Sequence, residues 1–226
     1  MKVRQNAFLG LFILVVLLDL FTGYFHFQGM RQFTKPFILL TLILFFWICG
    51  KRLDKKLYRY TLLALLFSLM GDILLLYDHL SPLYFMLGLI AFLLAHISYS
   101  VVFLIQGKII LKKKMRTVAV LLLVYGTALF MMLKDNLGTL KVPVIIYILG
   151  ILAMAITAFG RKDLVDHTSF KLVFIGALFF ILSDSILAVN KFLVAIPGSH
   201  FLVMGTYAAA QYLIVRGLLT GDQKLN

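Results

Sequence analysis

The sequence predicts an all-α membrane protein with eight transmembrane helices. Of its 226 residues, 62% are apolar and only 14% are charged, whereas about a quarter of the residues in a soluble domain are charged. The mean hydropathy is +1.03, and apolar runs long enough to cross a bilayer as a helix recur eight times along the chain. These values exclude an ordinary soluble enzyme and a disordered protein, because a soluble fold could not bury so much apolar surface.

Each apolar run is expected to be a helix, because lipid offers no hydrogen-bond partners to an open backbone. The first run resembles a signal peptide, but it is long and lacks a small-x-small cleavage site, which favours an uncleaved span. The short loops predict a single integral membrane domain over residues 1–226. In chain order the predicted spans are about 7–26, 33–49, 59–77, 83–106, 116–133, 141–160, 170–190 and 200–219.

The distribution of basic residues predicts how the chain crosses the membrane. With eight spans, 17 of the 22 Lys and Arg fall at one side of the membrane and 5 at the other. Cytoplasmic loops carry the excess of Lys and Arg, so we expect a multi-pass protein of the cell membrane with both termini in the cytoplasm. The basic residues are spread over short loops, whereas a protein that binds nucleic acid has them clustered in a patch, so we expect no nucleic-acid partner.

The two halves of the chain resemble each other. Residues 64–75, which contain Asp72, are similar to residues 176–187, which contain Asp184. Further landmarks recur in the same order: Lys35-Pro36 and Val142-Pro143, then Ala95-His96 and Ala210-Gln211. This pattern predicts two parallel four-helix repeats, about 7–106 and 116–219, related by an axis along the membrane normal. The alternative is that apolar helices resemble one another in general.

Three aspartates lie inside predicted spans: Asp19, Asp72 and Asp184. A charged group at the centre of a membrane helix costs about 2.5–3.5 kcal/mol on insertion scales and usually has a function. The repeat would place Asp72 and Asp184 symmetrically, about 8–10 Å inside the non-cytoplasmic boundary. Two carboxylates in a low dielectric do not readily ionise together, so we predict a catalytic dyad that supplies an acid and a base. In the alternative, which suits Asp19 best, each aspartate only binds a neighbouring helix.

Seven other polar residues are candidates for substrate binding or for supporting the dyad. His96, in the middle of its span, is either a proton relay or water-positioning group, or a structural core histidine. Lys35 begins its span and is either an anchor that extends to the interface or a partner for a phosphate or carboxylate. Tyr207 and Gln211 share a helix face, where they either serve the cavity or join helices. The full set is Lys35, His96, Tyr99, Ser183, Asn190, Tyr207 and Gln211.

The sequence predicts neither a metal nor a cofactor. The five histidines are scattered without a ligand motif, and no phosphate-binding or dinucleotide-binding loop is present. The single cysteine, Cys49, excludes an intramolecular disulfide and a cysteine-based zinc cluster. Ser185, beside Asp184, is a weak candidate for a nucleophile because no histidine is close to it in sequence.

Taken together, these motifs resemble the YhhN family, whose members include lysoplasmalogenases. The resemblance covers nearly the whole chain and rests on Thr34-Lys35-Pro36, Gly71-Asp72, Gly88 to Tyr99, Ser183-Asp184-Ser185, Asn190-Lys191-Phe192 and Tyr207 to Gly217. It implies an eight-span hydrolase that cleaves the vinyl ether bond of lysoplasmalogens, which are lysophospholipids, to a fatty aldehyde and a glycerophospho-head-group. The acidic positions of the family correspond to Asp72 and Asp184.

The predicted residues suit this chemistry. A vinyl ether hydrolyses when an acid protonates its β-carbon and water captures the resulting cation, so a neutral acid and a carboxylate suffice. An apolar bundle also suits a single-chain lipid. Two alternatives remain: a proton-coupled transporter that uses the same aspartates, and a structural or lipid-binding protein in which they only pack.

Overall fold

The computed structural model describes residues 2–25, 27–109 and 113–221, and within these residues the chain is helical without strands. Eight α-helices in this described part of the chain are long and apolar enough to cross a membrane, which confirms the predicted all-α, eight-span fold class. The helices are α1 (Lys2–Tyr24), α2 (Gln28–Cys49), α3 (Lys55–Leu76), α4 (Pro82–Gln106), α5 (Lys113–Leu133), α6 (Lys141–Phe159), α7 (His167–Phe192) and α8 (Ser199–Gly221).

Several helices begin a few residues before the apolar runs, because polar residues cap them outside the hydrocarbon region. The Asp54 carboxylate accepts two backbone N–H groups at the start of α3, and Asp166 does the same for α7. At α4, the Ser81 hydroxyl accepts a backbone N–H and Pro82 occupies the first turn. Such caps satisfy amide groups that have no partner within the helix.

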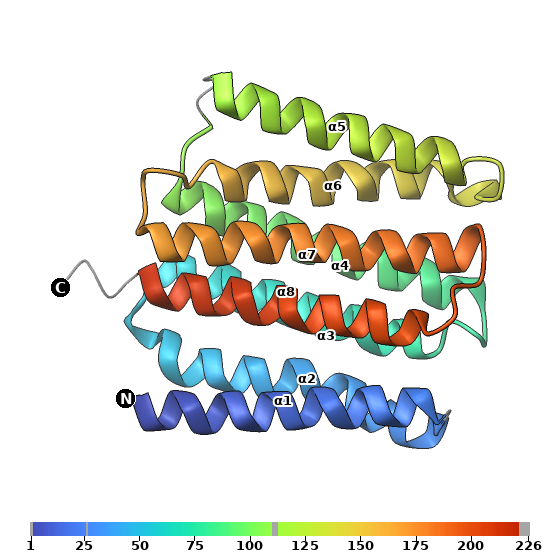
Figure 1. Cartoon of the computed structure of the whole chain (residues 1–226), viewed down its shortest axis with the longest axis horizontal. Coiled ribbons are helices and arrows are strands. Elements are labelled where there is room, and N and C mark those ends of the chain that lie inside the picture. The colour runs from blue at the N-terminus through green and yellow to red at the C-terminus, as the bar shows by residue number, and fades with distance from the viewer. Residues whose placement is uncertain (1, 26, 110–112, 222–226) are drawn as a thin grey trace.

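The eight helices lie side by side as one elongated bundle (Figure 1). In that view α1 and α2 form one edge and α5 forms the other. The most extensive helix contacts are between α7 and α8 and between α3 and α4, and α4 also packs against α6. By comparison α5 contacts α6 and, to a smaller extent, α7. The pairs α3–α4 and α7–α8 occupy corresponding places in the two predicted repeats, and the duplication itself stays a prediction.

Close approach between α7 and α8 depends on small residues. A side chain at Gly176 would lie 2.9 Å from the Ala210 carbonyl oxygen, and one at Gly217 would lie 3.0 Å from the Val173 nitrogen. Both contacts are with backbone atoms, which cannot move aside as a flexible side chain can. Small residues at helix interfaces in membranes allow backbones to approach in this way. This contact fixes the helix that carries Asp184.

The first helical residue, Lys2, and the last, Gly221, lie at the same end of the bundle, as an even number of spans requires (Figure 1). Two of the basic residues used to predict the orientation, Lys112 and Lys224, lie outside the described residues. The cytoplasmic location of the termini remains a prediction.

Orientation can be tested by labelling with a membrane-impermeant maleimide. In a Cys49→Ser background, Lys191→Cys is expected to react from outside intact cells, whereas Lys113→Cys is expected to react only after permeabilisation. Both positions are accessible, since Lys113 is exposed and the Lys191 side chain is 38% exposed beside Asp78. An exposed ion pair contributes little stability, so losing that pair should not disturb folding. The reverse labelling pattern would overturn the predicted topology.

Candidate active site

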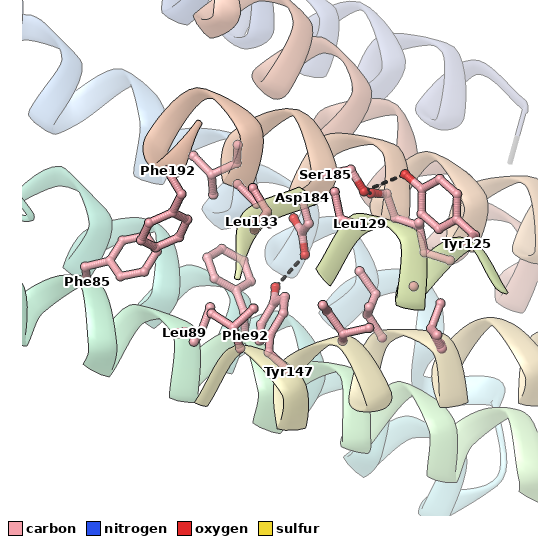
Figure 2. A pocket seen from close by; sticks show the side chains of 18 of the residues that line it. Phe85, Leu89, Phe92, Tyr125, Leu129, Leu133, Tyr147, Asp184, Ser185 and Phe192 are labelled. Atoms are coloured by element: carbon pink, nitrogen blue, oxygen red, sulfur yellow. Dashed lines mark hydrogen bonds between the residues drawn. The ribbon is translucent and has the colours of Figure 1, made fainter. Parts of the chain in front are cut away.

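An apolar pocket lies between helices α3 to α7, and the Asp184 carboxylate faces it (Figure 2). The pocket contains about 700 Å³ of empty space, part of which opens to the surroundings. Leucine, isoleucine, valine and phenylalanine side chains make up most of its lining. Polar side chains come from Tyr125, Tyr147, Asp184 and Ser185. An apolar cavity with a few convergent polar groups is typical of a site for an apolar ligand.

The Asp184 Oδ2 atom accepts a hydrogen bond from the Tyr147 hydroxyl (Figure 2). The His96 Nε2 atom lies 3.9 Å from the same oxygen. The Asp184 side chain is 16% exposed, whereas that of His96 is fully buried. Within the described part of the chain, no Lys or Arg lies within ion-pair distance of Asp184. Its carboxylate therefore meets the pocket with a tyrosine and a histidine as its polar neighbours.

Ser185, on the same wall of the pocket, is engaged with its own helix. Its hydroxyl donates to the Ile181 carbonyl oxygen at 2.7 Å and accepts from the Tyr125 hydroxyl at 2.7 Å (Figure 2). The hydrogen bonds of the described residues join no histidine to Ser185, so nothing there activates it as a nucleophile.

Asp72 lies in a different environment, as half of a buried ion pair. Its Oδ1 atom is 3.5 Å from the Lys35 ammonium, and both side chains are more than nine-tenths buried. The Tyr207 hydroxyl donates to Oδ2 at 2.8 Å. The Lys35 ammonium therefore lies inside the bundle beside a carboxylate.

A buried network extends from Asp72 on α3 through Tyr207 to two other helices, α4 and α8. Tyr99 donates to Gln211 Oε1 at 2.6 Å, and Gln211 Nε2 donates to Ser68 at 2.9 Å and to the Tyr207 hydroxyl at 3.4 Å. Four of the predicted site residues, Lys35, Tyr99, Tyr207 and Gln211, are thus brought together around Asp72. Completed networks of this kind hold a buried polar group in one orientation.

Aromatic rings connect the two carboxylate sites. The Tyr207 ring packs against Phe180 edge to face, with centroids 5.5 Å apart, and Phe180 packs against His96 at 4.7 Å. No hydrogen bond among the described residues joins Asp72 to Asp184 directly. Each aspartate has its own tyrosine partner, so the predicted pair occupies neighbouring sites with different surroundings. Its action as a catalytic dyad remains a prediction.

Two predicted site residues serve the backbone instead of the carboxylates. Ser183 donates to the Val203 carbonyl oxygen at 3.0 Å and so joins α7 to α8. Asn190 accepts the Ile196 backbone N–H at 2.9 Å, which shapes the α7–α8 loop. Among the described residues, neither side chain forms a hydrogen bond with Asp72 or Asp184.

Asp19 belongs to a cluster that the sequence did not indicate. Its Oδ1 atom accepts from the Thr34 hydroxyl at 2.9 Å, and its Oδ2 atom lies 3.4 Å from His200 Nε2. His200 Nδ1 is in turn 3.1 Å from an Arg31 nitrogen. The cluster joins α1, α2 and α8, with Thr34 next to Lys35 in the chain. These contacts agree with the structural alternative for Asp19.

Sequence reasoning also missed the pocket tyrosines, Tyr125 and Tyr147. The sequence feature that could have indicated them is a tyrosine in the middle of an apolar run, because a buried phenolic hydroxyl usually has a polar partner. Within the described ranges, no three His, Cys, Asp or Glu side chains gather where they could hold a metal ion.

Eight apolar helices enclosing buried carboxylates and an apolar pocket define a class: multi-pass α-helical membrane proteins with an acidic site inside the bundle. The model of the YhhN family matches residues 30–218, and the chain belongs to that family. The matched region contains every predicted site residue, from Lys35 to Gln211, and leaves all of α1 outside.

Similar proteins carry the name lysoplasmalogenase. The chain is 33% identical over 154 residues to lysoplasmalogenase TMEM86A of Homo sapiens, which covers 67% of this chain and 61% of the relative. It is 31% identical over 168 residues to a lysoplasmalogenase of Mycobacterium bovis, which covers 73% and 62%. The matches therefore span about three fifths of the length of these relatives. No solved structure matches the chain.

Proposed function

We propose that this chain is a membrane hydrolase that cleaves the vinyl ether bond of lysoplasmalogen-type lysophospholipids. Membership of the YhhN family and the names of the relatives support this reaction. The observation that carries the proposal is the Asp184 carboxylate in the wall of an apolar pocket. The alkenyl chain would occupy the pocket and bring the vinyl ether to the carboxyl group. The relatives' names favour this function over a transporter.

In this proposal the two aspartates differ in their roles. Asp184 has no Lys or Arg partner among the described residues, and a carboxyl group without a cation in apolar surroundings is more stable as the neutral acid. It is therefore the proton donor. Asp72, paired with Lys35, stays ionised and contributes the negative charge that steadies a cation nearby. The aspartate pair would then consist of an acid and a fixed anion.

The proposed reaction uses a carboxyl group and water and needs no metal ion. The Asp184 carboxyl group donates its proton to the β-carbon of the vinyl ether, and the α-carbon becomes an oxocarbenium ion bonded to the glycerol oxygen. Water adds to that carbon and loses a proton, which gives a hemiacetal. The hemiacetal then breaks its bond to the glycerol oxygen, which leaves protonated, and the fatty aldehyde is released. General acid–base catalysis of such steps contributes about 10²–10⁴-fold.

Aldehyde release from purified protein in detergent tests this function. A 1-alkenyl lysophospholipid is expected to give a fatty aldehyde, whereas the 1-alkyl analogue of the same chain length is expected to remain intact, because only the alkenyl ether can be protonated on carbon. Chelators are expected to leave the rate unchanged. Absence of aldehyde in detergent, together with gradient-driven uptake in sealed vesicles, would replace the hydrolase with a transporter.

A further inference from the structure

The imidazole of His96, on α4, is buried and forms no hydrogen bond with any described residue. Its exposed fraction is 0%, and neither Nδ1 nor Nε2 has a partner among the described residues. A neutral imidazole carries one donor and one acceptor. Buried polar atoms of this kind are nearly always paired with protein or with ordered water. Two unpaired nitrogens on one ring therefore point to a ligand that the protein itself does not supply.

Aromatic neighbours fix the direction of the ring. The His96 ring meets Phe180 edge to face with centroids 4.7 Å apart, and meets Tyr147 at 5.2 Å. Tyr147 is also the residue that donates a hydrogen bond to Asp184. Packing thus holds the imidazole beside Tyr147 and Asp184, and both of these residues line the pocket.

The distance between His96 and Asp184 suits a shared water molecule. Nε2 and Oδ2 are 3.9 Å apart, which is too long for a direct hydrogen bond. A water about 2.8 Å from both atoms would meet them at an angle of about 90°, and polar groups separated by more than 3.5 Å are often bridged in this way. Asp184 lines the pocket, from which a water could enter.

We propose that His96 Nε2 and Asp184 Oδ2 together bind the water molecule that attacks the oxocarbenium ion. This inference rests on the proposed function and assigns its nucleophile. It makes His96 a catalytic residue, since it touches a reacting atom. The same carboxyl group that protonates the β-carbon lies beside the water, so the acid and the nucleophile approach adjacent carbons of the bound alkenyl ether.

The proton balance of the step closes within this group of residues. When Asp184 has given its proton to the β-carbon, it becomes a carboxylate. The water oxygen forms a bond to the α-carbon, and its proton passes through His96 Nε2 or directly to the Asp184 carboxylate, which restores the acid. The restored acid then protonates the departing glycerol oxygen as the hemiacetal breaks, and the Asp184 carboxylate takes up the proton of the hemiacetal hydroxyl as that oxygen becomes the aldehyde carbonyl. Water is the only co-reactant, and nothing is oxidised or reduced.

Substitution of His96 separates water binding from packing. His96→Phe keeps a flat ring against Phe180 and Tyr147 but has no nitrogen, and we expect it to lower kcat by at least tenfold with little change in KM. His96→Gln retains a donor and an acceptor and is expected to keep more activity than His96→Phe. If His96→Phe retains the wild-type kcat, the assignment is wrong.

Chemical rescue provides a sharper test. His96→Ala is expected to lose activity and to regain part of it when imidazole is added, because the small molecule can occupy the vacated space and bind the water. The matched control is His79→Ala, at an exposed loop position, which should be neither impaired nor stimulated. Loss of activity without rescue in an Ala variant that is as stable as wild type would indicate a packing role and contradict the proposal.

An experimental structure tests the water independently of activity. Density within hydrogen-bond distance of both His96 Nε2 and Asp184 Oδ2 is expected in the wild-type protein. A direct contact between the two atoms, with no density between them, would overturn the water site. If the density is present but wild-type protein releases no aldehyde, the proposed function fails while the water site stands. If aldehyde is released and the density is absent, only this inference fails.

Discussion

Asp184→Asn is expected to lower aldehyde release by about 10²–10⁴-fold, the range attributed to a positioned acid or base. Asparagine has nearly the same shape and its oxygen can still accept the hydrogen bond from Tyr147, but it cannot donate a proton to carbon. The variant should therefore fold, extract and bind the lipid as wild type does. The measurement is turnover of the 1-alkenyl substrate by protein of matched thermal stability.

The control for this experiment is a carboxylate outside the bundle. Asp78 pairs with Lys191 at a distance of 2.6 Å, and both side chains are partly exposed. Asp78→Asn is expected to keep wild-type turnover, since exposed ion pairs contribute little. If Asp184→Asn also keeps near-normal turnover, then Asp184 is not the acid. Loss of activity in both variants to the same extent would point to a general effect on the protein.

Asp72→Asn is expected to act mainly on stability, because it leaves the Lys35 ammonium buried without its partner. Removing one partner of a buried ion pair costs about 3–5 kcal/mol, whereas replacing both with uncharged groups is often close to neutral. We expect Asp72→Asn and Lys35→Met each to lower the free energy of unfolding by about that amount. The double variant should recover most of the loss. Unfolding in mixed detergent micelles provides the measurement.

The double variant also tests the catalytic role of Asp72. With stability restored, the fixed anion is still missing, so aldehyde release is expected to stay below the wild-type level. Full recovery of turnover would show that the Asp72–Lys35 pair serves only the structure. Failure of the double variant to recover stability would mean that the pairing of the two charges is not what the single substitutions disturb.

The spans and the buried aspartates could be predicted because both leave strong signals in the sequence. Eight long apolar runs specify eight helices. An aspartate within such a run usually either has a function or is paired with a buried partner. Helix ends were harder to place because polar caps such as Asp54 and Asp166 extend the helices past the apolar runs. The partners of each aspartate depend on how the helices are rotated, which hydropathy does not encode.

The predicted repeat implies equivalent surroundings for Asp72 and Asp184, and so it did not indicate that the two sites differ. In the predicted repeat, Lys35-Pro36 corresponds to Val142-Pro143, so the second half has valine where the first has the cation that pairs with Asp72. Tyr147, which binds Asp184, lies on α6, whereas Tyr207, which binds Asp72, lies on α8. These helices do not correspond in the repeat. The sequence alone shows that the second half has no basic residue in the place of Lys35. The pairing of each aspartate with its tyrosine depends on tertiary packing.

Because α5 lies at the edge of the bundle (Figure 1), the shape of the pocket can change separately from the contacts of the two aspartates. This helix contributes Gly126, Leu129 and Leu133 to the pocket, yet none of the hydrogen bonds or ion pairs described for Asp72 and Asp184 comes from it. Substitutions along α5 are therefore expected to enlarge or shorten the space for the alkenyl chain of the proposed substrate while the acidic groups keep their partners. Under the proposed function, such substitutions would change the chain length that the pocket accepts without removing a partner of either aspartate.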